Sequence, residues 1–136
     1  MAETWVMGGY KTDTLTGKVQ KIGSCTGTTL SNSGQVFSVL GASYQVTAGK
    51  TFYITGIIWL KGDVAVNLAH IRYADNAALT TNPVAIGINA PTMAYTTPIP
   101  MISIAGLSAP AGKYVGIFDT SASSITVSVI IIGYEV

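Results

Sequence analysis

The sequence predicts an all-β protein built as an antiparallel β-sandwich, and three observations lead to this fold class. Val, Ile, Thr and Tyr dominate the chain and are interrupted at short intervals by Gly, Asn, Asp, Ser and Pro, a rhythm typical of many short strands. No window combines helix-favouring residues with an apolar period of 3.6. With 136 residues and a single cysteine, Cys25, the chain is long enough for one domain without a disulfide.

Nine strands are expected in chain order, each a run of β-branched or aromatic residues ended by turn residues. Together with the turns between them they predict two packed antiparallel sheets of eight or more strands, with less than a tenth of the chain in helix. The ranges are Thr4–Met7, Lys18–Ser24, Gln35–Leu40, Thr51–Lys61, Val64–Tyr73, Val84–Ile88, Met101–Ile104, Tyr114–Asp119 and Ile125–Tyr134.

Several residues in the middle of the chain predict turns, loops and irregularities between the strands. Gly62-Asp63 between two long strands predicts a two-residue hairpin turn. The apolar face of the fifth strand changes near His70, which predicts a bulge or a bend there. Pro98 and Pro100 lack the N–H groups that a central strand needs, so we expect residues 89–100 to form a long ordered loop. Two Ala-Gly-Lys turns, at 48–50 and 111–113, are either a coincidence or the trace of two related Greek-key halves.

The last strand alternates apolar residues with hydroxyls from Ile125 to Val129, which places the odd-numbered residues in the core. Ile130–Ile132 is then apolar on both faces. We expect the outward face of this segment to be covered by a neighbouring subunit.

Charge is scarce and unevenly placed. The chain is 49% hydrophobic and 10% charged, against about 25% charged in ordinary domains. The stretches 22–49 and 76–112 carry no charge. Because interface cores are depleted in charge, both are candidate subunit contacts, and we expect a closed homo-oligomer whose interface includes Met93, Tyr95, Ile99, Met101, Ile102 and Leu107. Ile102→Asp is expected to break it and Lys61→Glu to leave it intact.

The net charge of +1 does not indicate binding to nucleic acid or to an anionic membrane. The N-terminus lacks the features of a signal peptide, and residues 125–134 are too short to span a bilayer as a helix. We therefore expect a soluble protein made in a cytosol.

The residues that could serve in catalysis or metal binding do not cluster in the sequence. His70 and Cys25 are single, and no ligand spacing indicates a metal site, so we expect an ordinary strand histidine and a partly buried thiol. Four of the six carboxylates flank expected turns, and we do not expect Asp63, Asp75 and Asp119 to meet. No nucleophile elbow or phosphate loop is present. The sequence therefore predicts neither an enzyme nor a cofactor.

Aromatic residues leave an alternative open, because rings with polar edges can stack on sugars. Trp59 follows Ile57 and Ile58 and is expected in the core or an interface. Trp5 lies in a polar segment, where it either anchors a partner or packs on its own domain. A carbohydrate-binding module, such as a tail-fibre head or lectin-like domain, is the alternative function.

The C-terminal third, with Ala109-Pro110-Ala111-Gly112-Lys113-Tyr114 followed by Ile125–Val136, resembles small jelly-roll head decoration (cement) proteins of tailed bacteriophages. The resemblance extends over about the last 90 residues. It implies a jelly-roll domain at 16–136, a homotrimer on the capsid surface of a virion assembled in the host cytoplasm, the major capsid protein as partner, and no catalysis. It also implies an N-terminal arm or edge strand at 1–15 that contacts a neighbour, with Trp5, Val6, Met7 and Tyr10 as candidate partner-binding residues.

Overall fold

The described chain consists of strands joined by turns and loops. The computed structural model describes residues 3–6, 10–13, 18–63, 69–91, 96–102 and 107–136, and for side chains the same ranges without 3–6, 10–13, 28–29 and 101–102. These ranges hold thirteen strands and no helix, which confirms the all-β prediction. The strands are β1 Glu3–Val6, β2 Tyr10–Asp13, β3 Lys18–Leu30, β4 Ser33–Val36, β5 Ser38–Val39, β6 Ala42–Ser43, β7 Phe52–Gly62, β8 Ala69–Ala74, β9 Val84–Asn89, β10 Ile99–Ile102, β11 Ser108–Ala109, β12 Tyr114–Asp119 and β13 Ile125–Glu135.

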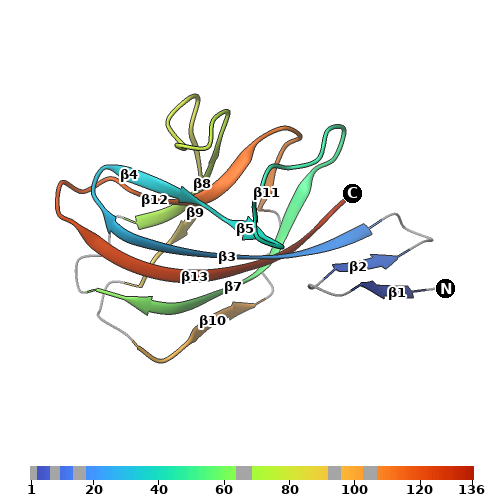
Figure 1. The fold of residues 1–136 in the computed structure, drawn as a ribbon, viewed down its shortest axis with the longest axis horizontal. Coiled ribbons are helices and arrows are strands. Elements are labelled where there is room, and N and C mark those ends of the chain that lie inside the picture. The colour runs from blue at the N-terminus through green and yellow to red at the C-terminus, as the bar shows by residue number, and fades with distance from the viewer. Residues whose placement is uncertain (1–2, 7–9, 14–17, 64–68, 92–95, 103–106) are drawn as a thin grey trace.

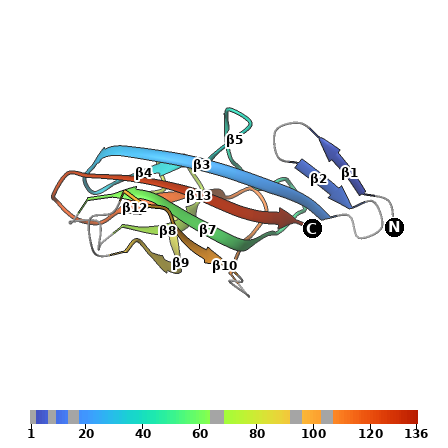
Figure 2. The ribbon, with the colours of Figure 1, turned by 90° about the horizontal axis from the view of Figure 1, so that it is seen from below.

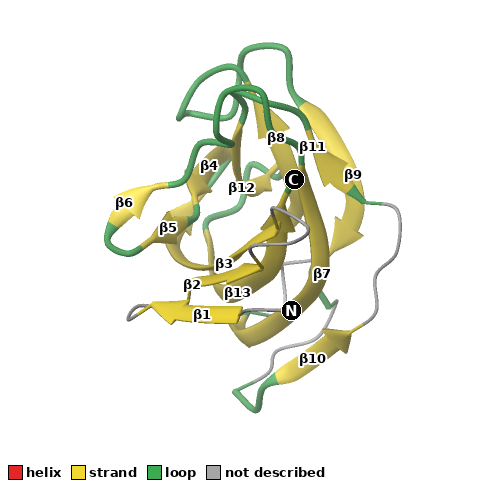
Figure 3. Cartoon of the chain, turned by 90° about the vertical axis from the view of Figure 1, so that its right-hand side faces the viewer, coloured by secondary structure: helices red, strands yellow, loops and turns green. Residues whose placement is uncertain are grey.

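Two antiparallel sheets make up the fold. The larger has nine strands in the order β1-β2-β3-β13-β7-β10, with β11 also pairing β7 and with β5 and β6 attached to β3; the smaller has the order β4-β12-β8-β9. Figure 1 shows β3, β13 and β7 side by side as long curved strands, with the four-stranded sheet on one side of them. Figure 3 shows how strongly β7 curves, from beside β13 toward β11. This arrangement is consistent with the predicted β-sandwich.

The core lies between the two sheets, and β13 contributes to it as its alternation predicts. Every odd-numbered residue of β13 is buried and every even-numbered one is half-buried. Trp59 on β7 is fully buried among these apolar side chains, which confirms its predicted place in the core. At Gly133 an added Cβ would collide with the backbone oxygen of Tyr53 and the ring of Phe52, so only glycine fits the close approach of β13 to β7 there.

β7 and β8 do not pair with each other across the predicted hairpin turn at Gly62-Asp63, and residues 64–68 of the expected strand lie outside the described residues. β7 belongs to the nine-stranded sheet, whereas β8 pairs with β12 and β9 in the other sheet. Asp63 is instead tied to the start of β13: its N–H donates to the Thr126 oxygen at 3.2 Å, and its Oδ2 accepts from the Thr126 N–H at 2.7 Å. The chain therefore leaves one layer and enters the other after this point.

Two other expectations need revision, and three strands were not foreseen. The expected strand Gln35–Leu40 is divided between the two sheets as β4 and β5. The expected loop at 89–100 ends early, because β10 begins at Ile99 and pairs Pro100 with Ile58. Since β10 lies at the end of the sheet order, a proline without an N–H is tolerated there. Strands β2, β6 and β11 were not expected from the sequence.

The expected irregularity near His70 is present one residue later. The pairing of β8 with β9 shifts register between Ile71 and Arg72. The extra residues lie on β9, where Gly87 has a φ of +83°, a conformation that glycine adopts without strain. The bulge therefore belongs to β9 rather than β8.

Candidate functional site

The predicted partner-binding residues lie in a hairpin at the end of the large sheet. Trp5 and Val6 are on β1 and pair with Lys11 and Tyr10 of β2, while Met7 lies outside the described residues. Only Thr12 and Asp13 of β2 pair with β3. Figures 1 and 2 both show this hairpin beyond the main body of the sandwich, near the start of β3. The division into an N-terminal arm at 1–15 and a domain at 16–136 stays a prediction.

The predicted interface residues fall largely at the opposite edge of the sheet. Ile99, Met101 and Ile102 are on β10 and pair with β7, and the oxygen of Leu107 accepts from the Ile54 N–H of β7 at 2.9 Å. Ile99 and Leu107 are half-buried against the main core. Met93 and Tyr95 lie outside the described residues. The structure thus brings four of the six to one sheet edge.

A row of aliphatic side chains crosses the outer face of the nine-stranded sheet. Ile132 pairs with Ile22 of β3, and Ile130 pairs with Ile58 of β7, so the four side chains point to the same side. They alternate with buried neighbours, which places them away from the core. Ile22 is 38% exposed and the others are half-buried. We call Ile22, Ile58, Ile130 and Ile132 the outer aliphatic patch.

Aromatic rings and hydroxyls flank this patch along the strands, with Lys18 at one end and Lys61, which pairs with Ser128, at the other. On one side Tyr53 and Tyr134 stack with ring centroids 5.5 Å apart, and the Lys18 ammonium lies 4.8 Å from the Tyr134 centroid. On the other side the hydroxyls of Thr26 and Ser128 are hydrogen-bonded at 3.1 Å. The sequence indicated only the isoleucines of β13; their partners on β3 and β7 became apparent from the strand register.

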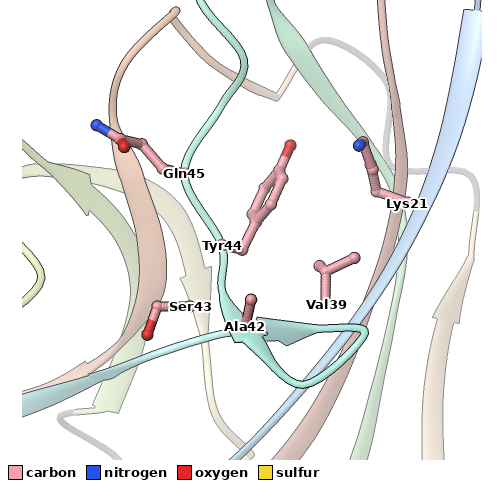
Figure 4. Close-up of a pocket in the computed structure, with 6 residues that line it drawn as sticks. All are labelled: Lys21, Val39, Ala42, Ser43, Tyr44 and Gln45. Atoms are coloured by element: carbon pink, nitrogen blue, oxygen red, sulfur yellow. The ribbon is translucent and has the colours of Figure 1, made fainter.

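A polar pocket of about 170 Å³ opens beside β5 and β6. Figure 4 shows the Tyr44 hydroxyl and the Lys21 ammonium at the same end of it. The buried Glu135 carboxylate accepts from the Tyr44 hydroxyl at 2.9 Å and from the Thr47 N–H at 3.1 Å, and its Oε2 lies 3.8 Å from the Lys21 ammonium. These contacts hold the end of β13 to the segment after β6. The lining residues are Lys21, Val39, Ala42, Ser43, Tyr44 and Gln45.

The titratable residues considered from the sequence lie in separate places. Cys25 is buried, and its burial raises the pKa of the thiol to about 12, so it stays protonated at neutral pH. Asp63 bonds to Thr126 and Asp119 to Ser121, while Asp75 pairs with Lys113 and Asn82. Within the part of the chain that is described, no three His, Cys, Asp or Glu residues gather as metal ligands would.

Comparison of the chain with protein-family models, with curated proteins and with solved structures gave no match. Among the described residues there is no helix of the length and hydropathy needed to cross a bilayer.

Proposed function

We propose that this chain is a virion structural protein: a jelly-roll decoration, or cement, protein that binds the major capsid protein on the surface of a phage head. It acts as a closed homo-oligomer, a trimer by the resemblance of its C-terminal third to such proteins. It reinforces the shell by burying its own surface, without catalysis or a cofactor and without binding nucleic acid or membrane.

The observation that carries this proposal is the outer aliphatic patch. Four isoleucines form two directly opposed pairs across β3, β13 and β7, on a face that the other sheet does not cover. Burying apolar surface contributes roughly 25 cal/mol per Å², and specific interfaces commonly bury about 800 Å² on each partner. Linking three copies multiplies the avidity for a repetitive shell.

The scarcity of charge supports the same proposal. The folded chain exposes 6740 Å², yet only seven Lys or Arg and six Asp or Glu are available to cover it. Contiguous apolar surface on a free monomer promotes aggregation, whereas a closed ring or a capsid covers that surface and limits growth.

The test is the addition of purified protein to heads of the encoding phage that were assembled without it. We expect wild-type protein to co-sediment with these heads and to raise the temperature at which they release DNA. Ile132→Asp, on the patch, should fail in both assays, while Lys61→Glu, an exposed residue on β7, should behave as wild type. Heads that neither bind the protein nor gain stability would overturn the proposal.

A second candidate function, carbohydrate binding, is favoured by the stacked Tyr53–Tyr134 pair, because Tyr53 is 38% exposed and phenol rings can stack on sugars. Trp59 is fully buried and cannot take that role. A glycan array separates the two functions: saturable binding that Tyr53→Ala abolishes would favour the carbohydrate module.

A further inference from the structure

The only arginine and the only histidine of the chain lie on one face of β8. His70 pairs with Phe118 of β12, and Arg72 pairs with Gly116. Directly opposed residues point to the same side of a sheet, whereas Ile71 between them belongs to the main core. His70, Arg72 and Phe118 therefore share the outer face of the four-stranded sheet, on the opposite side of the sandwich from the outer aliphatic patch.

Arg72 is held flat on this face. Its Cζ lies 3.1 Å from the centroid of the Phe118 ring, and the residue is 8% exposed. Gly116 lies opposite Arg72 on β12, and the space beside it is filled by Leu79 Cδ1 and by the backbone of β4. A neighbouring wall is formed by Leu79, which packs with Phe118 and Ala74. Stacking on an aromatic ring orients the planar fork of an arginine.

The guanidinium lacks a counter-charge in the described chain. Its Nε is buried without a hydrogen-bond partner, and no described carboxylate forms an ion pair with it. Burial lowers the pKa of Arg72, because a buried charge is costly unless it is paired and hydrogen-bonded. Bidentate bonding to an oxyanion is the pairing that a fixed guanidinium fork matches best.

We propose that Arg72, stacked on Phe118 beside His70, is the centre of a binding site for a small oxyanion, a carboxylate or a phosphate. The ligand oxygens bond to the guanidinium N–H groups and supply the missing counter-charge. This site is separate from the surface used for the proposed function, so either proposal can fail without the other.

The test uses the tag-free wild-type protein, because its single arginine gives one unambiguous Nε–H signal in a ¹H–¹⁵N spectrum and its single histidine gives one ring signal. Acetate, phosphate and, as the ionic-strength control, chloride are titrated in turn. We expect a saturable shift of both signals with acetate or phosphate, with a dissociation constant on the order of millimolar, and only a small linear drift with chloride. The stronger of the two anions identifies the ligand as a carboxylate or a phosphate.

Two variants test the role of the fork. Arg72→Lys keeps the charge without the bidentate geometry, and we expect it to weaken binding at least about tenfold as measured on the His70 signal. Lys61→Gln removes a cation from the other sheet and should bind as wild type. Equal shifts with chloride and with both oxyanions in the wild-type protein would overturn the proposal, as would unchanged affinity in a folded Arg72→Lys variant.

Discussion

Replacing Leu79 with Ala tests how the loop at residues 75–82 is held over the four-stranded sheet. Leu79 is 0% exposed and packs with Val36, Ala74 and Phe118. Its Cδ1 occupies the space beside Gly116, where an added Cβ would approach it to 2.7 Å. Truncating a buried leucine to alanine costs about 2.7–5 kcal/mol. Since a loop relaxes more readily than a core strand, we expect a loss near the lower end, about 3 kcal/mol.

The backbone conformation of Leu79 gives a second prediction, which compares the glycine variant with the alanine variant. Its φ is +60°, a left-handed conformation that costs a non-glycine residue roughly 1–2 kcal/mol. Leu79→Gly relieves this strain and loses only one more buried carbon than Leu79→Ala, worth about 0.8 kcal/mol. We therefore expect the glycine variant to be at least as stable as the alanine variant.

Urea denaturation measures both free energies of unfolding, with the buried Trp59 as the fluorescent reporter. Protein concentration is held fixed, because oligomerisation stabilises the folded state. Ala78→Ser, at an exposed position of the same loop, is the control and should stay within about 0.5 kcal/mol of wild type. A loss below about 1 kcal/mol for Leu79→Ala, or a glycine variant clearly less stable than the alanine variant, would refute the reasoning.

Three other perturbations probe the interior. Glu135→Gln should cost about 2 kcal/mol in urea denaturation, because the buried carboxylate accepts from Tyr44 and Thr47 and pairs with a lysine; an unchanged midpoint would contradict this. Gly133→Ala should abolish soluble expression or lower stability by about 3 kcal/mol, since its Cβ meets backbone; wild-type stability would contradict this. Burial raises the pKa of Cys25 to about 12. The thiol therefore keeps its proton to higher pH in the folded state than in the unfolded state, and the free energy of unfolding falls as pH rises above about 9. Cys25→Ser should flatten that fall, and rapid iodoacetamide labelling of the folded protein at pH 8.5 would contradict the burial.

Most of the strands could be predicted because their information is local. The alternation in β13 and the turn residues around β12 fix those elements without reference to the rest of the chain. Pairing partners are not local, and this explains why β8 does not pair with β7 across Gly62-Asp63. That dipeptide suits a tight turn, but Asp63 is held instead by Thr126, 63 residues away.

The candidate surfaces could likewise be predicted only in part. The isoleucines of β13 were recognisable from the sequence, but Ile22 and Ile58 join them only through the register of three strands. The sequence did not single out Arg72, because its contact with Phe118 depends on the pairing of β8 with β12. A sequence shows which residues are unusual, whereas the pairing of strands decides which of them meet.

The proposed decoration function requires a closed homo-oligomer, in which the outer aliphatic patch of each copy is buried against another copy. Sedimentation equilibrium at micromolar concentration tests it most directly, on the wild type, Ile132→Asp and Lys61→Glu. We expect the wild type and Lys61→Glu to sediment as one closed oligomer with three times the 14.1 kDa mass of the chain, and Ile132→Asp to sediment as monomer or to precipitate. A well-behaved wild-type monomer would contradict the account.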